Sequence, residues 1–181
     1  GIRAEALGGS DMSLSILDSE YRFEGTVSGS NPARSWLNGD VSDSADLTLL
    51  IENGMPRNSM AGFTNFIDLA SEDSGTITTT IRNTTIGDTI GQGIDIEAFD
   101  TSRVTLDVIG STLSNSGAGL LDVLANDQAV ASSTLTSNTL INPANRAITL
   151  LSKATNSTDN ARVGATLTSN QFQALSGALR A

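Results

Sequence analysis

Five aspartates recur at a nearly constant interval along the chain, and they are the first residues whose type and spacing could do chemistry. The residues are Asp43, Asp73, Asp100, Asp127 and Asp159, and the two middle intervals of the series are identical. Carboxylate oxygens are the ligands that Ca²⁺ prefers, and an aspartate can also accept backbone N–H groups in a turn. The sequence therefore leaves two interpretations: a row of weak Ca²⁺ sites, or a structural ladder in which each aspartate caps its own turn.

A second acidic pair, Asp68 and Asp95, is separated by the same interval as Asp73 and Asp100. It could add ligands to the same cation sites only if its side chains face the same edge. The Gly-Gly-x-Gly-x-Asp nonapeptide of calcium-binding β-rolls does not occur in the chain. Its absence favours the turn ladder over the calcium row.

Composition excludes several other chemistries. The 181 residues include no histidine and no cysteine, which removes the commonest general base and thiolate chemistry. Ten basic and 20 acidic residues give a net charge of −10, which disfavours nucleic acid, and no apolar run is long enough to insert into a membrane. We predict no catalytic residues and no cofactor other than Ca²⁺ in the calcium interpretation, and we favour a noncatalytic protein over an enzyme.

An internal repeat explains the interval between the aspartates. Shifting the sequence on itself by the interval between Asp73 and Asp100 places Ile67-Asp68-Leu69 on Ile94-Asp95-Ile96, and the match continues without a gap to Ile86 and Leu113. Larger shifts bring residues 2–21 and 37–51 into the same frame. One repeat of this length cannot bury its own apolar face, so neighbouring repeats must cover it, as in a solenoid.

Three columns of the repeat predict what is buried. Apolar residues alternate within each repeat, as in Val104, Leu106 and Val108, which is typical of strands with one inward face. The first apolar column is Ile2, Leu37, Ile67, Ile94, Leu121 and Ile148; the second is Ile16, Ile51, Ile81, Val108, Leu135 and Leu167. A column of small residues lies between them: Ser10, Ala45, Gly75, Ser102, Ala129 and Ala161.

These patterns predict an all-β, right-handed parallel β-helix of about six coils, with a partial seventh. Equivalent residues lie one coil apart, so successive strands must run parallel, and such connections wind to the right. At about 4.8 Å per coil the rod is about 29 Å long. The predicted single segment, residues 1–181, divides roughly into coils 1–33, 34–65, 66–92, 93–119, 120–146 and 147–178.

The intervals between coils lengthen where loops leave the rod, at residues 25–33, 55–65 and 155–159. Trp36 follows the first of these loops, and we predict that it is a core or lid residue rather than a platform for a ligand. Asn138 and Asn170 share a turn position with Ser19, Thr84 and Ser111, which predicts a structural side-chain ladder. Residues 178–181, Ala-Leu-Arg-Ala, are similar to Gly-Ile-Arg-Ala at residues 1–4, so we expect uncovered coil ends and head-to-tail self-association, or a slice of a longer protein.

The order of elements in each coil carries a family resemblance. An Ile-x-Ile strand (Ile94 to Ile96), an Asp/Ser turn, a Val-x-Leu-x-Val strand (Val104 to Val108) and a Ser/Asn-Thr-Leu step (Ser111 to Leu113) follow one another. This order resembles the right-handed β-helix proteins of bacterial surfaces, including adhesin and passenger segments, and the broader pectin-lyase-like superfamily. The resemblance implies a noncatalytic, extracellular structural or adhesive rod, a segment of a longer cell-surface protein or fibre, with carbohydrate or a host or cell-surface molecule as its partner.

An alternative within the same resemblance is a carbohydrate-binding or Ca²⁺-dependent polysaccharide lyase-like module. Polygalacturonase-like hydrolases share Asn-Thr-Asp, Asp-Asp, Gly-His-Gly and Arg-Ile-Lys motifs, none of which occurs here. Pectate lyases share an acidic Ca²⁺ cluster with an arginine as base. Arg103 and Arg162 fall in one column near the aspartate ladder, so the residue types for a lyase are present.

Overall fold

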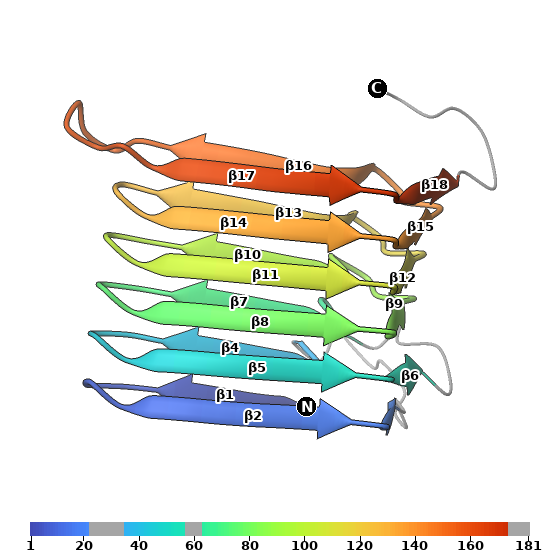
Figure 1. Cartoon of the computed structure of the whole chain (residues 1–181). Helices are drawn as coiled ribbons and strands as arrows, with labels where there is room; N and C mark the ends of the chain where they lie inside the picture. The colour runs from blue at the N-terminus through green and yellow to red at the C-terminus, as the bar shows by residue number, and fades with distance from the viewer. Residues whose placement is uncertain (22–34, 57–62, 174–181) are drawn as a thin grey trace, which may run out of the picture.

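The computed structural model describes residues 1–21, 35–56 and 63–173, and throughout these ranges the chain forms strands and turns without a helix (Figure 1). Each coil contributes three strands in a fixed order. The strands of successive coils stack in parallel sheets, with the first coil at one end and the last coil at the other. The predicted all-β architecture of stacked parallel coils is confirmed.

The first sheet contains the first strand of every coil. Its order is β1 (Ile2–Ala6), β4 (Leu37–Val41), β7 (Ile67–Ser71), β10 (Ile94–Ala98), β13 (Gly119–Asn126) and β16 (Arg146–Lys153). The second sheet has the same coil order, with β2 (Asp11–Leu17), β5 (Asp46–Glu52), β8 (Thr76–Arg82), β11 (Arg103–Ile109), β14 (Val130–Thr136) and β17 (Arg162–Thr168).

Short strands complete each coil. A third sheet holds β9 (Thr85–Gly87), β12 (Thr112–Ser114), β15 (Thr139–Ile141) and β18 (Gln171–Gln173), and a separate pair holds β3 (Glu20–Tyr21) and β6 (Met55–Pro56). The predicted loop at residues 25–33 and the predicted partial seventh coil lie outside the described residues. The described part of the loop at 55–65 begins with β6.

The registers agree with the columns predicted from the repeat. Ile94 pairs with Ile67 on one side and with Leu121 on the other. In the second sheet Ile81, Val108 and Leu135 are successive partners. These side chains are fully buried, and burying each one stabilises the fold by about 1.5–3 kcal/mol. The core is therefore a set of apolar rows that run along the stack.

The small column marks the bend between the first and second sheets. A Cβ atom added to Gly75 would lie 2.6 Å from the Cγ1 atom of Val41 and 3.1 Å from the Oγ atom of Ser71. Ala45 and Ala129 occupy the same position in other coils and are completely buried. Close contact between the turn and the end of the first-sheet strand therefore limits side-chain size at this position.

Trp36 belongs to the core. Its ring stacks on that of Phe66, with centroids 4.8 Å apart and planes 19° apart, and only 9% of the residue is exposed. The prediction of a core or lid residue is confirmed. The tryptophan directly precedes β4, the first-sheet strand of its coil.

Replacing Ile81 by alanine tests the continuity of the core rows. We expect Ile81→Ala to lower the free energy of unfolding by about 2–5 kcal/mol, because the side chain is fully buried between two coils. Thr78→Ala on the exposed side of the same strand is the matched control, with an expected loss of less than about 1 kcal/mol. Urea unfolding followed by circular dichroism measures both, and equal losses would contradict a continuous core.

Candidate functional site

The predicted aspartate column lies in the turns that join the first sheet to the second. Asp43, Asp73, Asp100 and Asp127 all have positive φ, between 55° and 59°. Gly8 holds the corresponding turn of the first coil, with φ of 65°. Aspartate is one of the few side chains that tolerate this left-handed conformation. The recurrence of aspartate is therefore explained first by the backbone of the turn.

The carboxylates of the column bond between coils. Asp43 Oδ2 accepts the N–H of Gly8 at 3.1 Å, and Asp73 Oδ2 accepts the N–H of Asp43 at 3.2 Å. Asp100 Oδ2 accepts the N–H of Asp73 at 3.2 Å. The prediction that each of these aspartates caps its own turn was wrong. Stacked turns place the N–H of one coil beside the carboxylate of the next, so the acceptor serves the neighbouring coil.

Asp127 and Asp159 differ from the other three. The N–H of Asp127 donates to the carbonyl of Lys153 at 3.1 Å. Asp159 lies in the longer turn between β16 and β17, and its carboxylate accepts the N–H of Asn156 within that turn. In the described part of the chain, no three acidic side chains converge in an arrangement that could hold a metal ion. A row of Ca²⁺ sites stays a prediction.

A second acidic array lies on the outward face of the first sheet. Asp68, Asp95 and Asp122 are successive register partners on β7, β10 and β13. Their side chains alternate with buried residues, so they are on the outer surface, and each is partly buried. Glu97 lies two residues after Asp95 on the same face. We call Asp68, Asp95, Asp122 and Glu97 the acidic face.

Each aspartate of the acidic face accepts a hydrogen bond from the preceding coil. Ser35 Oγ donates to Asp68 Oδ2 at 2.9 Å. Asn65 Nδ2 donates to Asp95 Oδ2 at 3.2 Å, and Gln92 Nε2 donates to Asp122 Oδ2 at 3.2 Å. The three donors share one position, two residues before a first-sheet strand. This polar ladder holds the carboxyl groups in line along the stack.

Crowding perturbs the acid in the middle of the row. Burial raises the pKa of Asp95 to about 7, the charges of Glu97, Asp68 and Asp122 also raise it, and the hydrogen bond from Asn65 lowers it. Burial and then the charge of Asp68 raise the pKa of Glu97, against the opposing effect of Lys153. With a pKa of about 7, Asp95 can take up or release a proton near neutral pH, which suits a group that exchanges a proton or donates a hydrogen bond.

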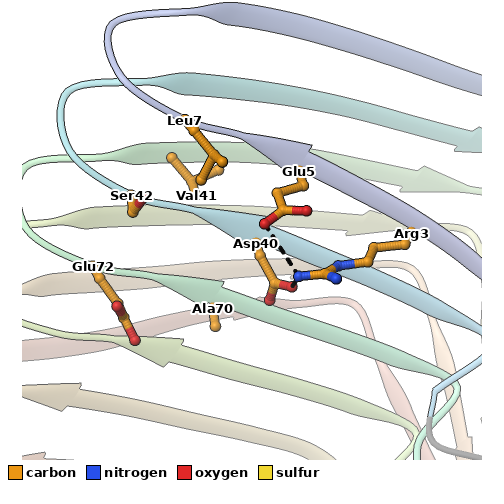
Figure 2. A pocket seen from close by; sticks show the side chains of 8 residues that line it. All are labelled: Arg3, Glu5, Leu7, Asp40, Val41, Ser42, Ala70 and Glu72. Carbon is orange, nitrogen blue, oxygen red and sulfur yellow. Dashed lines mark ion pairs between the residues drawn. The ribbon is translucent and has the colours of Figure 1, made fainter.

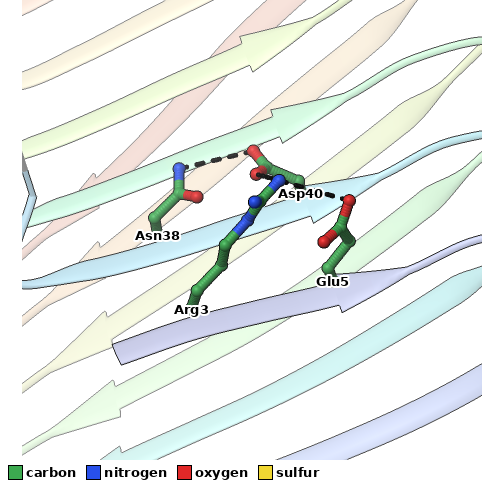
Figure 3. A network of polar contacts seen from close by, with 4 residues as sticks. All are labelled: Arg3, Glu5, Asn38 and Asp40. Atoms are coloured by element: carbon green, nitrogen blue, oxygen red, sulfur yellow. Dashed lines mark hydrogen bonds and ion pairs between the residues drawn. The ribbon is translucent and has the colours of Figure 1, made fainter. Parts of the chain in front are cut away.

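Arg3 partly offsets the charge of two carboxylates at the end of the first sheet nearest the N-terminus. Arg3 Nη2 lies 3.2 Å from Glu5 Oε1 and 3.3 Å from Asp40 Oδ2, and Asn38 Nδ2 donates to Asp40 Oδ1 at 3.3 Å (Figure 3). A pocket of about 200 Å³ lies beside this cluster, with Leu7 and Glu72 among its walls (Figure 2). The Arg3 side chain is 63% exposed, so these pairs add at most about 1 kcal/mol to stability.

The structure brings together Asp68 and Asp95, as the repeat suggested, and adds Asp122, which the sequence prediction missed. The pair faces outward from a strand and does not share the turn edge of the aspartate column. The period of the repeat links all three positions and is the signal that could have found Asp122. Arg103 and Arg162 lie in one column at the start of the second-sheet strands, with Val130 between them.

The predicted asparagine ladder is present at the corner after the second sheet. Asn138 Oδ1 accepts the N–H of Ser111 at 2.8 Å, and Asn170 Oδ1 accepts the N–H of Asn138 at 2.9 Å. In coils closer to the N-terminus, Ser111 and Thr84 use their hydroxyl oxygens in the same way. The predicted ladder is confirmed for Thr84, Ser111, Asn138 and Asn170, whereas the hydroxyl of Ser19 donates to the carbonyl of Leu17 within its own coil.

No protein-family model, curated protein or solved structure matches this chain. Residues 1–21, 35–56 and 63–173 include no helix that is long and apolar enough to cross a bilayer. The acidic face and the turn ladder are therefore interpreted from their own geometry.

Substitutions at Asp73 separate its backbone role from its side-chain role. We expect Asp73→Ala to lower the free energy of unfolding by about 1–3 kcal/mol, because alanine disfavours positive φ and removes the acceptor for the Asp43 N–H. Asp73→Asn keeps both properties and is expected to cost less than about 0.5 kcal/mol. Urea unfolding compares the two variants. Equal and large losses would show that the negative charge itself is required, as in a cation site.

The pKa of Asp95 predicts a pH-dependent stability. The unfolded chain releases this proton near pH 4 and the folded chain near pH 7, so between these values only the folded state holds it, and stability falls as pH rises. The expected loss is less than about 4 kcal/mol. Urea unfolding from pH 4.5 to 8 should show Asp95→Asn gaining stability relative to the natural chain as pH rises. A difference between the two that is constant with pH would contradict the assignment.

Proposed function

We propose that the chain is a noncatalytic structural or adhesive rod: a segment of a right-handed parallel β-helix that belongs to a longer extracellular or cell-surface protein or fibre. The observation that carries this proposal is where the polar groups point. At the turns, at the corner after the second sheet and on the first sheet, side chains bond to the next coil along the stack. Side chains that hydrogen-bond from one coil to the next resist bending of the stack and so stiffen a rod.

Two features support the right-handed winding. Crossover connections between parallel strands of one sheet are almost always right-handed. In Figure 1 the first-sheet strands point left behind the second-sheet strands, which point right, while the chain climbs from the N-terminus. This direction of travel supports the right-handed winding that we propose.

The side faces support a role in which surface loops or distal segments make the contacts with a partner. Half of the outward positions of the second sheet are hydroxyl residues, such as Thr78, Thr105 and Ser132, which suit a solvated strand surface. The net charge of −10 favours solubility. Both properties fit a stiff extracellular spacer that presents an adhesive surface to carbohydrate or to a cell-surface molecule.

One observation favours a second candidate, a carbohydrate-binding or carbohydrate-cleaving module. Asp95 lies between two other carboxyl groups on coils that are about 4.8 Å apart, and its pKa of about 7 lets it donate or accept a proton. Such a row can hydrogen-bond to successive hydroxyls of an extended sugar chain. An acidic polysaccharide would also need Ca²⁺ to offset the repulsion between its carboxylates and the acidic face.

Calorimetry with the full chain distinguishes the two candidates. The ligands are CaCl₂, neutral cello- and xylo-oligosaccharides, and oligogalacturonate with and without Ca²⁺, and a parallel assay measures new reducing ends and unsaturated products. For the rod we expect no product from any sugar and no saturable heat with Ca²⁺. Product formation that Asp95→Asn abolishes would overturn the noncatalytic proposal.

Matched variants locate any binding that is found. If the acidic face binds sugar, Asp95→Asn and Asp122→Asn should each weaken the affinity about tenfold, which corresponds to about 1.4 kcal/mol. Asp73→Asn is the control, because it removes one charge from the turn ladder and leaves the acidic face intact. Equal weakening by all three variants would indicate a general effect of charge and would count against a site on the acidic face.

A further inference from the structure

The turn that follows each second-sheet strand contains a residue with positive φ. The residues at this position are Asp18, Asn53, Asn83, Gly110, Ser137 and Ser169. Asparagine and aspartate are among the few side chains that tolerate the left-handed conformation. Asn53, with φ of 56°, is therefore explained by the backbone of its turn, and the residue is exposed to solvent.

The next residue of each turn has a recurring role, and one coil departs from it. Side-chain oxygens of Thr84, Ser111, Asn138 and Asn170 accept an N–H group of the preceding coil. At the same position of the second coil the residue is Gly54, which has no side chain. The departure places an asparagine directly before a glycine in an exposed turn.

We propose that Asn53 is a modification site, at which the side-chain amide is lost by spontaneous deamidation. The backbone nitrogen of Gly54 attacks the Cγ atom of Asn53, so that a bond between these atoms forms and closes a succinimide ring. The bond between Cγ and Nδ2 breaks, and Nδ2 leaves as ammonia with the proton that the Gly54 nitrogen releases through solvent. Water then opens the ring at either carbonyl and gives aspartate or isoaspartate.

The attacking nitrogen is weakly held in the structure. The N–H of Gly54 donates to Thr84 Oγ1 at 3.3 Å, which is longer than the usual N–H···O distance. Asn53 and Gly54 lie between β5 and β6, outside the paired strands. Gly54 also has no Cβ atom that would hinder the approach of its nitrogen to Cγ. These features favour ring closure at this turn.

The side-chain amide of Asn53 belongs to a ladder along the corner. Its Nδ2 atom donates to Asp18 Oδ1 at 2.8 Å, and Asn83 Nδ2 donates to Asn53 Oδ1 at 3.4 Å. Attack on Cγ places negative charge on Oδ1, and a donor aimed at that oxygen stabilises the charge. The ladder therefore supplies a group that assists the reaction.

The second Asn-Gly pair of the chain is protected by its place in the fold. Asn38 and Gly39 belong to β4, which pairs with β1 on one side and with β7 on the other. The N–H groups of such a strand are bonded in the backbone ladder. A Cβ atom added to Gly39 would lie 2.9 Å from Leu69 Cδ2, so the strand is also tightly packed. Ring closure at Asn38 requires local unfolding of the sheet.

Deamidation reverses the role of Asn53 in the ladder. The product side chain is a carboxylate that faces the carboxylate of Asp18, so repulsion replaces the hydrogen bond between Nδ2 and Oδ1. Isoaspartate also lengthens the backbone of the turn. We therefore expect either product to weaken the corner between β5 and β6. The proposal depends on the fold alone and not on what the rod binds.

The test follows the full chain during incubation at neutral and mildly alkaline pH. Peptide mapping by mass spectrometry measures aspartate and isoaspartate at each asparagine, and a synthetic peptide of residues 49–56 gives the rate without a fold. We expect Asn53 to convert within about tenfold of the peptide rate and Asn38 to stay unconverted over the same period, because a central strand opens rarely. Alkaline pH should accelerate the reaction, since the attacking amide must lose its proton.

Gly54→Ser is the matched variant, because serine occupies the same position at Ser111. We expect it to slow conversion at Asn53 about tenfold, which corresponds to about 1.4 kcal/mol in activation free energy. Asn115 is an internal control: its Nδ2 atom donates to Asp88 Oδ1 in a similar ladder, but the next residue is Ser116. We expect no conversion at Asn115 in the same period. Circular dichroism shows whether the variant is folded.

A second pair of variants measures the effect of the product. Asn53→Asp should lower the urea midpoint, because it removes the donor to Asp18 and adds a like charge beside it. Combining Asn53→Asp with Asp18→Asn restores one donor and one acceptor in exchanged positions. We expect the combined variant to recover most of the lost midpoint. Failure to recover it would contradict the assigned role of the ladder.

Three results would overturn the modification site. The first is an Asn53 that stays intact in the full chain while the peptide is completely converted, because the fold would then protect it. The second is conversion at Asn38 that is as fast as at Asn53. The third is an unchanged rate in Gly54→Ser, which would show that the Gly54 nitrogen is not the attacking group.

Discussion

The structure depends on one constraint: each residue has, as its neighbour in the sheet, the residue at the same position of the next coil. The parallel backbone ladder imposes this pairing at every strand, as for Ile67, Ile94 and Leu121. Like residues therefore form rows about 4.8 Å apart. The arrangement stabilises apolar rows, because each side chain buries the next. It destabilises rows of carboxylates, since the same spacing brings like charges together. Each acidic row therefore needs a hydrogen bond, a counter-charge or a proton that reduces the repulsion.

The chain compensates its polar rows in three ways. At the turns, positive φ directs the N–H of one aspartate to the carboxylate of the next coil. At the corner after the second sheet, the amide oxygen of Asn138 takes the place of a carboxylate and brings no charge. On the acidic face the donors are neutral side chains, and repulsion among Asp68, Asp95 and Asp122 persists until Asp95 takes up a proton. Unrelieved repulsion of this kind has a structural cost, and it is the reason that the acidic face is the candidate for a ligand.

Much of this arrangement could be predicted from the period of the sequence. The spacing of Ile67, Ile94 and Leu121 determines the columns, and alternation in Val104 to Val108 determines which side chains are buried. The hydrogen-bond direction of Asp43 and Asp73 could not be predicted, because it depends on a left-handed turn that the residue type permits without requiring. The sequence did not predict the three donors to the acidic face, Ser35, Asn65 and Gln92. The equivalent hydrogen bond is made by three different types of side chain, so no residue type repeats at this position. Asp159 has the right residue type, but the longer turn around it supplies a donor of its own, Asn156.

The acidic row stops before it reaches either end of the described stack. The column of Asp68, Asp95 and Asp122 continues to Asn38 and Arg3 in one direction and to Thr149 in the other. In this rod the strict repetition stabilises the core, and the residues that depart from it, Arg3, Asn38 and Thr149, confine the row of like charges to the middle coils.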